Sequence, residues 1–277
     1  MRERLFHLPE VPTITTFHSF AHDILKKSDY DFEIITDQDR NEIIHTLVEK
    51  TKGKEGTIKD VKEIGLEISK YKNTQVEIDK AIASSSNLHQ IPCNDIIEYY
   101  NNQLKLRNLV DYDDLIVILY KELQNKNNNV FAMVKHIQHV LVDEFQDTNR
   151  LQYEVIKLFS KPESLFVIGD PYQSIYGFRG ADASIFKQIK KDFPEAMEIV
   201  LQDNYRSTKE IIQSSSALFP EINTLRAHNA DRGTVQIVTT CDEYTEAQYV
   251  LNVINKKVGG TDLLKTDNVE KSAIRFA

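Results

Sequence analysis

HVLVDEFQDTNRLQYEVI, residues 139–156, changes abruptly from apolar to acidic and then becomes apolar again at helical spacing. Val140–Val142 is a short continuous apolar run, which is typical of a buried strand. Asp143 and Glu144 follow that run directly, and Leu151–Phe159 has the pattern of a helix. The segment therefore predicts a strand, a polar turn and a helix, with two adjacent carboxylates where the strand ends.

The same strand-and-helix unit recurs downstream. Leu165–Ile168 is a second apolar run closed by a glycine, Ser184–Lys191 is a predicted helix, and Met197–Leu201 is a predicted third strand. Buried strands that alternate with helices predict a parallel sheet covered on both faces. Because right-handed crossovers bring the carboxyl ends of such strands to one edge, ligands bind at that edge.

The rest of the chain is predicted to be mostly helical. A short strand, Thr13–Thr16, precedes a helix that begins at Phe17, and residues 28–108 have the pattern of a helical insertion into the α/β unit. Its expected elements are a helix capped by Asp37, a helix carrying Val61 to Tyr71, a short helix around Ile78 to Ile82, a loop at Ser84–Asn87 and a helix from Cys93 through Leu106. From Asn204 onward we expect a helix, a loop, a strand at Val235–Thr239 and a helix at Thr245–Ile254.

Composition excludes several classes of protein. The 277 residues are 41% hydrophobic and 27% charged, with a net charge of −8, which fits a globular protein and disfavours a uniformly basic surface. The chain has no apolar stretch long enough for a membrane span, and residues 1–5 are too charged for a signal peptide. Cys93 and Cys241 form no metal-ligand pattern, so we expect reduced thiols in a cytoplasmic protein.

Two adjacent carboxylates after a buried strand suit a magnesium–nucleotide site. One carboxylate can hold the hydrated metal, and its neighbour can orient and deprotonate a water molecule. The competing interpretation of Asp143 and Glu144 is a helix N-terminus, where acidic residues are favoured in any case.

GDPYQSIYGFRGAD, residues 169–182, follows the second strand and should reach the same edge. Gln173 offers an amide that can contact a phosphate or a water. Tyr176, Phe178 and Arg179 lie close together in sequence, and aromatic rings beside an arginine can stack on unpaired bases. The alternative for the two rings is hydrophobic packing against the helical insertion.

Two further stretches contain candidate ligand-binding residues. In LQDNYRSTKEI, residues 201–211, Tyr205 could stack on a base such as adenine and Arg206 could reach a transferring phosphate. The alternative is a capped helix with a surface arginine. In TTFHSFA, residues 15–21, Phe17 and His18 could face nucleic acid, although a lone histidine is more often structural.

The four stretches with candidate site residues, taken in chain order, resemble the conserved sequence blocks of the UvrD/Rep/PcrA family of superfamily-one DNA helicases. The matching residues are TFHSFA, LVDEFQDTN, GDPYQSIYGFRGA and NYRST, and the resemblance extends over nearly the whole chain. It implies an enzyme that hydrolyses ATP with Mg²⁺, moves 3′ to 5′ along single-stranded DNA and separates the duplex.

The resemblance also implies roles for single residues. Asp143 would hold magnesium, Glu144 would activate water and Gln173 would sense the γ-phosphate. Tyr205 would stack on adenine, and Arg206 would contact the γ-phosphate. Single-stranded DNA would be contacted by Tyr176, Phe178 and Arg179, joined by Phe17 and His18. Phe178 stands where many relatives have tryptophan, which leaves a smaller stacking face.

The implied fold is a parallel-sheet RecA-like core of the P-loop NTPase type, interrupted by a helical insertion. Residues 1–27 and 109–203 would form the first core domain, residues 28–108 the insertion, and residues 204–277 the start of the second core domain.

The G-x-x-x-x-G-K-S/T phosphate loop does not occur in the sequence. We therefore expect an incomplete core, an internal piece that begins after this loop, works with the remainder of a helicase chain and is inactive as an ATPase by itself. Two alternatives stay open: a non-catalytic DNA-binding or regulatory module, and one half of a split helicase.

Overall fold

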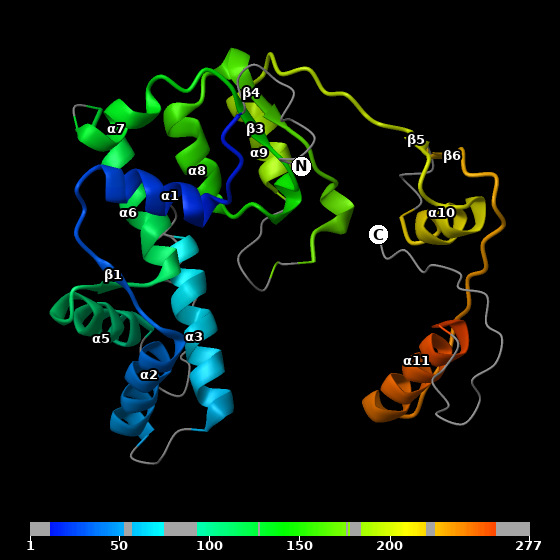
Figure 1. The fold of residues 1–277 in the computed structure, drawn as a ribbon, viewed down its shortest axis with the longest axis horizontal. Helices are drawn as coiled ribbons and strands as arrows, with labels where there is room; N and C mark the ends of the chain where they lie inside the picture. The colour runs from blue at the N-terminus through cyan, green and yellow to red at the C-terminus, as the bar shows by residue number, and fades with distance from the viewer. Residues whose placement is uncertain are drawn as a thin grey trace. The chain divides into compact units, whose positions relative to one another are not determined.

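A computed structural model describes residues 12–52, 57–74, 93–126, 128–175, 177, 184–219 and 225–258. The chain divides into two compact units, residues 1–197 and 198–277. The helices of the first unit are α1 (Phe17–Lys27), α2 (Asp37–Lys52), α3 (Ile58–Asn73), α5 (Cys93–Leu106), α6 (Tyr112–Gln124), α7 (Asn129–Val134), α8 (Arg150–Phe159) and α9 (Ile185–Asp192), with strands β1 (Glu33–Ile34), β2 (Leu109–Val110), β3 (Val140–Val142) and β4 (Leu165–Val167) (Figure 1). The second unit contains β5 (Asp203–Asn204), α10 (Lys209–Ser216), β6 (Arg226–Ala227) and α11 (Glu243–Val258).

Local sequence signals set where several helices begin. The Thr16 hydroxyl accepts a hydrogen bond from the Ser19 amide (3.2 Å) at the start of α1, as expected of an N-cap. Asp111 with Asp114, and Asn149 with Gln152, form reciprocal capping boxes at the starts of α6 and α8. These caps satisfy amides that have no partner inside the helix.

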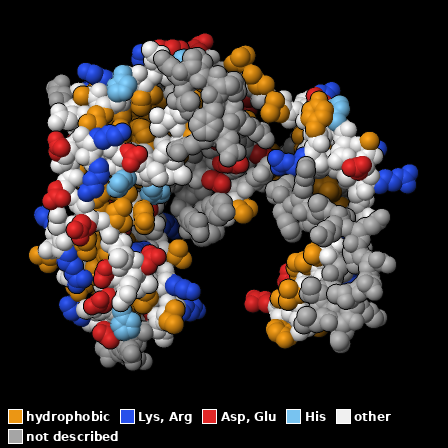
Figure 2. All heavy atoms as spheres, viewed as in Figure 1, with side chains coloured by type: hydrophobic (Ala, Val, Ile, Leu, Met, Phe, Trp, Pro, Cys, Tyr) orange, Lys and Arg blue, Asp and Glu red, His pale blue; other side chains and the backbone are white. Residues whose placement is uncertain are grey.

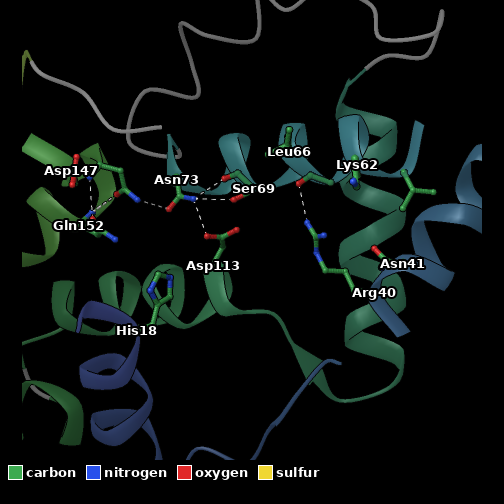
Figure 3. A pocket seen from close by; sticks show the side chains of 13 residues that line it. His18, Arg40, Asn41, Lys62, Leu66, Ser69, Asn73, Asp113, Asp147 and Gln152 are labelled. Carbon is green, nitrogen blue, oxygen red and sulfur yellow. Dashed lines mark hydrogen bonds between the residues drawn. The ribbon is translucent and has the colours of Figure 1, made fainter. Parts of the chain in front are cut away.

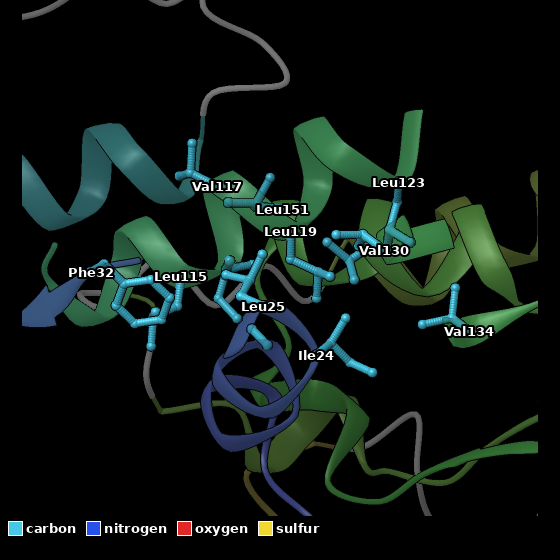
Figure 4. Packing of buried hydrophobic residues seen from close by; sticks show 13 residues of the cluster. Ile24, Leu25, Phe32, Leu115, Val117, Leu119, Leu123, Val130, Val134 and Leu151 are labelled. Atoms are coloured by element: carbon cyan, nitrogen blue, oxygen red, sulfur yellow. The ribbon is translucent and has the colours of Figure 1, made fainter. Parts of the chain in front are cut away.

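The largest hydrophobic cluster joins helices from distant parts of the sequence. In Figure 4, Ile24 and Leu25 of α1 lie against the α6 side chains Leu115 and Leu119, while Val130 and Val134 come from α7. Leu119 is fully buried, and Leu151 adds α8 to the same cluster. Burial of this apolar surface holds α1, α6, α7 and α8 together.

A second cluster holds the predicted insertion together. It is built from α2, α3 and α5, and its buried members are Ile35, Ile43, Ile44, Leu47, Val48, Ile64, Ile68, Ile96, Ile97, Tyr100 and Leu104. The short parallel pair of β1 with β2, which the sequence pattern did not predict, adjoins this cluster through Ile35 and Leu109. The helices α2, α3 and α5 therefore share a hydrophobic core that is separate from the first cluster.

A buried ion cluster lies where α3, α5 and α6 meet. The ammonium of Lys72, which is 1% exposed, lies 2.7 Å from a carboxylate oxygen of Asp111 and 2.7 Å from one of Asp114. The Tyr100 hydroxyl donates to the same oxygen of Asp111 at 3.0 Å. Burial opposes ionisation of Asp111, but the Lys72 charge and hydrogen bond hold its pKa below the ordinary value. Burial and the Asp111 charge raise the pKa of Asp114.

The strands β3 and β4 pair in parallel, with Leu141 opposite Phe166. Val140, Val142, Leu165 and Val167 pack on the side of Phe145, Tyr153, Ile156 and Ile185, which form a third cluster with α8 and α9. The opposite face is open, since Leu141 is 74% exposed and Phe166 is 54% exposed. The expectation that helices cover both faces is therefore wrong for this pair.

Three predicted strands do not form. Thr13–Thr16 is irregular and ends in the cap of α1, while Met197–Leu201 and Val235–Thr239 have no strand partner among the described residues. Their side chains are largely exposed, Ile237 at 95% and Met197 at 83%. β-propensity reflects packing on a pleated surface, so an apolar run without a neighbouring strand does not become one. The predicted helix around Ile78 and the loop at Ser84–Asn87 lie outside the described residues.

Charges of both signs are spread over the first unit. In Figure 2, Lys and Arg side chains are interspersed with Asp and Glu over the visible face. Within the part of the chain that the structure describes, no helix has the length and apolar character needed to cross a bilayer.

Candidate functional site

Asp143 and Glu144 lie directly after β3, as the sequence predicted. Both residues are exposed, and the Glu144 amide donates to Oδ1 of Asp143 at 3.0 Å. The backbone of Glu144 has a φ of 51°, a left-handed conformation that residues other than glycine rarely adopt. Such strain persists only where surrounding contacts enforce it and is often found at functional sites.

The loop after β4 is joined to the loop after β3 by backbone hydrogen bonds. The Ile168 amide donates to the Val142 carbonyl, and the Phe145 amide donates to the Ile168 carbonyl, both at 2.9 Å. Gly169 follows at the point of closest approach, where an added Cβ would lie 2.5 Å from Oε1 of Gln146. The two loops therefore form one surface at the carboxyl ends of β3 and β4.

Gln146 links the two loops through its side chain. It is 3% exposed, and its Nε2 donates to Oε2 of Glu144 at 2.5 Å. Its Oε1 accepts from the Asp170 amide at 3.0 Å. Gln146 was not a predicted site residue, because a glutamine in a polar turn gives no local signal that its amide will bridge to a second loop.

Gln173 is oriented by Asp170. The Gln173 side-chain amide donates to Oδ2 of Asp170 at 2.9 Å, and Oδ1 of Asp170 accepts from the Tyr172 amide at 3.0 Å. Hydrogen bonds therefore run from Glu144 through Gln146 to Asp170 and on to Gln173. The structure brings three predicted site residues, Asp143, Glu144 and Gln173, to one edge of the β3–β4 pair.

The acidic pair fits a magnesium ion that also has phosphate and water ligands. Mg²⁺ is usually bound by one or two carboxylates, with phosphates and water completing an octahedron. Asp143 is exposed at the strand end and uses Oδ1 for the Glu144 amide, so Oδ2 is its candidate ligand atom. Among the described residues, no group of three or more His, Cys, Asp or Glu side chains forms a metal site.

Phe17 and His18 differ in their surroundings. Phe17 is partly buried and packs against both the first and the third hydrophobic clusters. His18 lines an open groove of about 780 Å³, and its ring lies edge-on to Tyr112, with 6.2 Å between centroids. Tyr112 is 59% exposed and was not a predicted site residue. An aromatic residue directly after the helix cap Asp111 was the signal available for it.

Polar side chains from α3, α6 and α8 line this groove (Figure 3). Asn149 donates to Asn73 at 2.8 Å, and Asn73 donates to Asp113 at 2.9 Å. Asp147, in the turn that follows Glu144, also lines the groove. Asn73, at the end of α3, is thus hydrogen-bonded to the first residues of α6 and to the N-cap of α8.

In the second unit, Tyr205 and Arg206 lie in a tight turn after β5. Oδ1 of Asn204 accepts hydrogen bonds from the amides of Arg206 (3.0 Å) and Ser207 (2.8 Å), which fixes the turn. Tyr205 is 73% exposed. Three other predicted site residues, Tyr176, Phe178 and Arg179, lie outside the described residues.

Comparison with known proteins gives consistent matches. A family model described as the UvrD/REP helicase N-terminal domain matches residues 1–194. The chain is 32% identical to a probable DNA helicase II homolog of Mycoplasma capricolum, over 93% of this chain and 38% of that protein. It is 32% identical to the ATP-dependent DNA helicase Rep of Buchnera aphidicola, over 87% of this chain and 37% of that protein. It is 30% identical to the ATP-dependent DNA helicase PcrA of Staphylococcus epidermidis, over 92% of this chain and 37% of that protein. The chain thus spans less than two fifths of the length of these relatives.

Proposed function

Because the chain belongs to the UvrD/REP helicase family, we propose that it forms part of an ATP-dependent DNA helicase. In that enzyme it supplies half of the ATP-hydrolysing site and part of the surface that binds single-stranded DNA. The helicase moves 3′ to 5′ on single-stranded DNA and separates the duplex. Residues 1–27 and 109–203 belong to a RecA-like core domain with a helical insertion at residues 28–108, and residues 204–277 belong to a second core domain. The partners of the chain are ATP, single-stranded and duplex DNA, and the remainder of a helicase chain.

The observation that carries the proposal is the hydrogen-bonded surface at the ends of β3 and β4. Glu144, Gln146, Asp170 and Gln173 are connected there, beside Asp143. In the proposed mechanism, Asp143 would hold Mg²⁺, and the ion would neutralise negative charge on the phosphates. The Glu144 carboxylate accepts a proton from the attacking water, and Gln146 keeps that carboxylate in place.

The other roles concern the nucleotide and its phosphates. The Gln173 amide contacts the γ-phosphate, and the Arg206 guanidinium stabilises charge on the transferring phosphoryl group. Tyr205 provides a stacking face for adenine. Support for these roles comes from the exposed Tyr205 ring and from the turn that Asn204 fixes around Arg206.

The first prediction concerns ATP hydrolysis by the chain as it stands. We expect steady-state phosphate release in the presence of Mg²⁺ and single-stranded DNA to be indistinguishable from a Glu144→Gln control. The reason is that the sequence lacks the G-x-x-x-x-G-K-S/T loop, whose backbone amides and lysine grip the phosphates.

The test of the proposed function is to supply that loop. A phosphate-loop segment fused ahead of Met1 should restore DNA-stimulated turnover, and Glu144→Gln in the same fusion should lower it about 100-fold or more. The hypothesis fails if the folded fusion binds ATP and DNA but Glu144→Gln leaves turnover unchanged. Robust turnover by the unfused chain that depends on Glu144 would contradict the first prediction alone.

The second prediction concerns DNA binding. We propose that Phe17, His18, Tyr176, Phe178 and Arg179 contact single-stranded DNA. Removing one stacking ring costs about 1–3 kcal/mol, so Phe178→Ala should weaken binding of an oligothymidylate roughly 5- to 150-fold. Affinity should also fall as salt rises, with a log–log slope of about −0.7 per neutralised phosphate.

Fluorescence anisotropy with a labelled oligothymidylate measures this effect. Phe219→Ala, in the second unit, is the matched control for loss of a phenylalanine ring, and it should bind DNA like the parent chain. Equal affinity of Phe178→Ala and Phe219→Ala would show that the ring of Phe178 makes no contact with DNA.

A further inference from the structure

Two aromatic rings of the second unit are stacked. The centroids of Tyr205 and His228 are 4.7 Å apart, and their planes differ by 21°. Tyr205 is nevertheless 73% exposed. One face of its ring therefore rests on His228, and the residue keeps most of its surface open to a ligand.

His228 is held by a charged group on the neighbouring strand. Its Nε2 lies 2.8 Å from Oδ1 of Asp203, and Nε of Arg226 lies 3.0 Å from the same oxygen. The His228 hydrogen bond and then the Arg226 charge lower the pKa of Asp203, so this carboxylate stays ionised as an anchor. The imidazole ring is thus fixed at its edge while its face supports Tyr205.

The backbones of the two segments are joined as well. The Arg226 amide donates to the Gln202 carbonyl, and the His228 amide donates to the Asn204 carbonyl, both at 2.8 Å. Asn229 donates from its side chain to the Arg206 carbonyl at 3.2 Å. The segment that carries His228 therefore holds the turn that carries Tyr205 on both sides of the ring.

We propose that His228 is a positioning residue that holds the Tyr205 ring in place to stack on the adenine of a nucleotide. This inference rests on the adenine-stacking role of Tyr205 in the proposed function. An exposed tyrosine ring without support loses rotamer freedom when a base stacks on it. His228 removes part of that cost, because it restricts the ring before the nucleotide arrives.

The test uses the full chain with ¹³C-labelled tyrosine rings, and AMP as the probe. Tyr205→Phe removes the labelled ring and so assigns the Tyr205 signals. In the free protein, His228→Ala should abolish the ring-current shift of these signals, and His228→Phe, which retains a ring, should keep much of it.

AMP should shift the Tyr205 signals of the parent chain, and His228→Ala should bind AMP about 3- to 10-fold more weakly. His45→Ala, a histidine of the first unit, is the control and should match the parent chain.

The outcomes separate the inference from the proposed function. Equal AMP affinity in the parent chain and His228→Ala overturns the positioning role and leaves adenine stacking on Tyr205 intact. A ring-current shift that depends on His228, with no AMP-induced change at Tyr205, overturns the adenine role itself. An oligothymidylate that shifts the Tyr205 signals as strongly as AMP overturns the assignment to a nucleotide and identifies a DNA contact.

Discussion

Replacement of Lys72 by methionine is expected to lower the free energy of unfolding of the first unit by about 3–5 kcal/mol. Methionine has a similar length and can fill the space, but it cannot compensate the charges of Asp111 and Asp114. Both carboxylates lie 2.7 Å from the Lys72 ammonium in the ion cluster between α3, α5 and α6. Without the cation, one or both must be buried unpaired or take up a proton.

This expectation includes a dependence on pH. Asp111 has a lowered pKa in the folded protein, so its stabilising contribution is present above its unfolded pKa and is lost as pH falls through the folded value. In Lys72→Met the cation that lowers this pKa is gone, and burial raises it. A carboxyl group whose folded pKa is raised binds a proton more readily when folded, so stability then increases as pH falls. The difference between the parent chain and the variant should therefore narrow from pH 7 to pH 5.

Urea unfolding followed by far-ultraviolet circular dichroism measures both effects. Lys70→Met is the matched control, because Lys70 is in the same helix and is exposed. The control should change the unfolding free energy by less than about 0.5 kcal/mol. A loss of similar size in both variants, or one that does not vary with pH, would mean that the ion cluster does not determine this stability.

Replacement of Gly169 by alanine should destabilise the first unit by about 3 kcal/mol. The added Cβ would lie 2.5 Å from Oε1 of Gln146 and 2.9 Å from the backbone nitrogen of Phe145. The side-chain amide could rotate away, but the backbone nitrogen is held by its hydrogen bond to the Ile168 carbonyl. The loops after β3 and β4 must therefore separate, and the link from Gln146 to Asp170 should break.

Gly177→Ala is the control for this change, because a Cβ at Gly177 would meet no atom of the described residues within 4 Å. Urea unfolding of the two variants gives the stability difference. Amide hydrogen exchange shows whether the Asp170 amide loses protection in Gly169→Ala, as it should when Oε1 of Gln146 no longer accepts its hydrogen bond. Unchanged stability and unchanged exchange at Asp170 would show that the loops can absorb a Cβ.

Much of the first unit could be predicted from local pattern. Apolar periodicity interrupted by polar residues predicts the strands β3 and β4, the helices α1, α3 and α8, and the position of Asp143 and Glu144. Met197–Leu201 and Val235–Thr239 have equally apolar patterns, yet neither forms a strand. A strand needs a partner for its backbone, and a one-dimensional pattern does not show whether that partner is there.

Local sequence pattern does not predict three contacts of the structure. They are the link through Gln146, the ion cluster around Lys72, and the stacking of Tyr205 on His228. Lys72 and Asp111 are 39 positions apart, and Gln146 and Asp170 are 24 apart. The sequence does not distinguish a buried lysine in a helix from an exposed one, because burial depends on residues that are distant in sequence. The exposure of Tyr112 likewise depends on how α6 packs.

The sequence by itself determined the order of the predicted helices and of the strands β3 and β4, and it placed the acidic pair at the end of β3. Those features depend on the periodicity of side chains and on caps within three residues of each other, which are local properties. The tertiary structure alone decided which polar groups became partners: Gln146 between the two loops, Lys72 between two aspartates, and His228 under Tyr205. For the buried Gln146 and Lys72 such partners are necessary, because a polar group removed from water must find its hydrogen bonds within the fold.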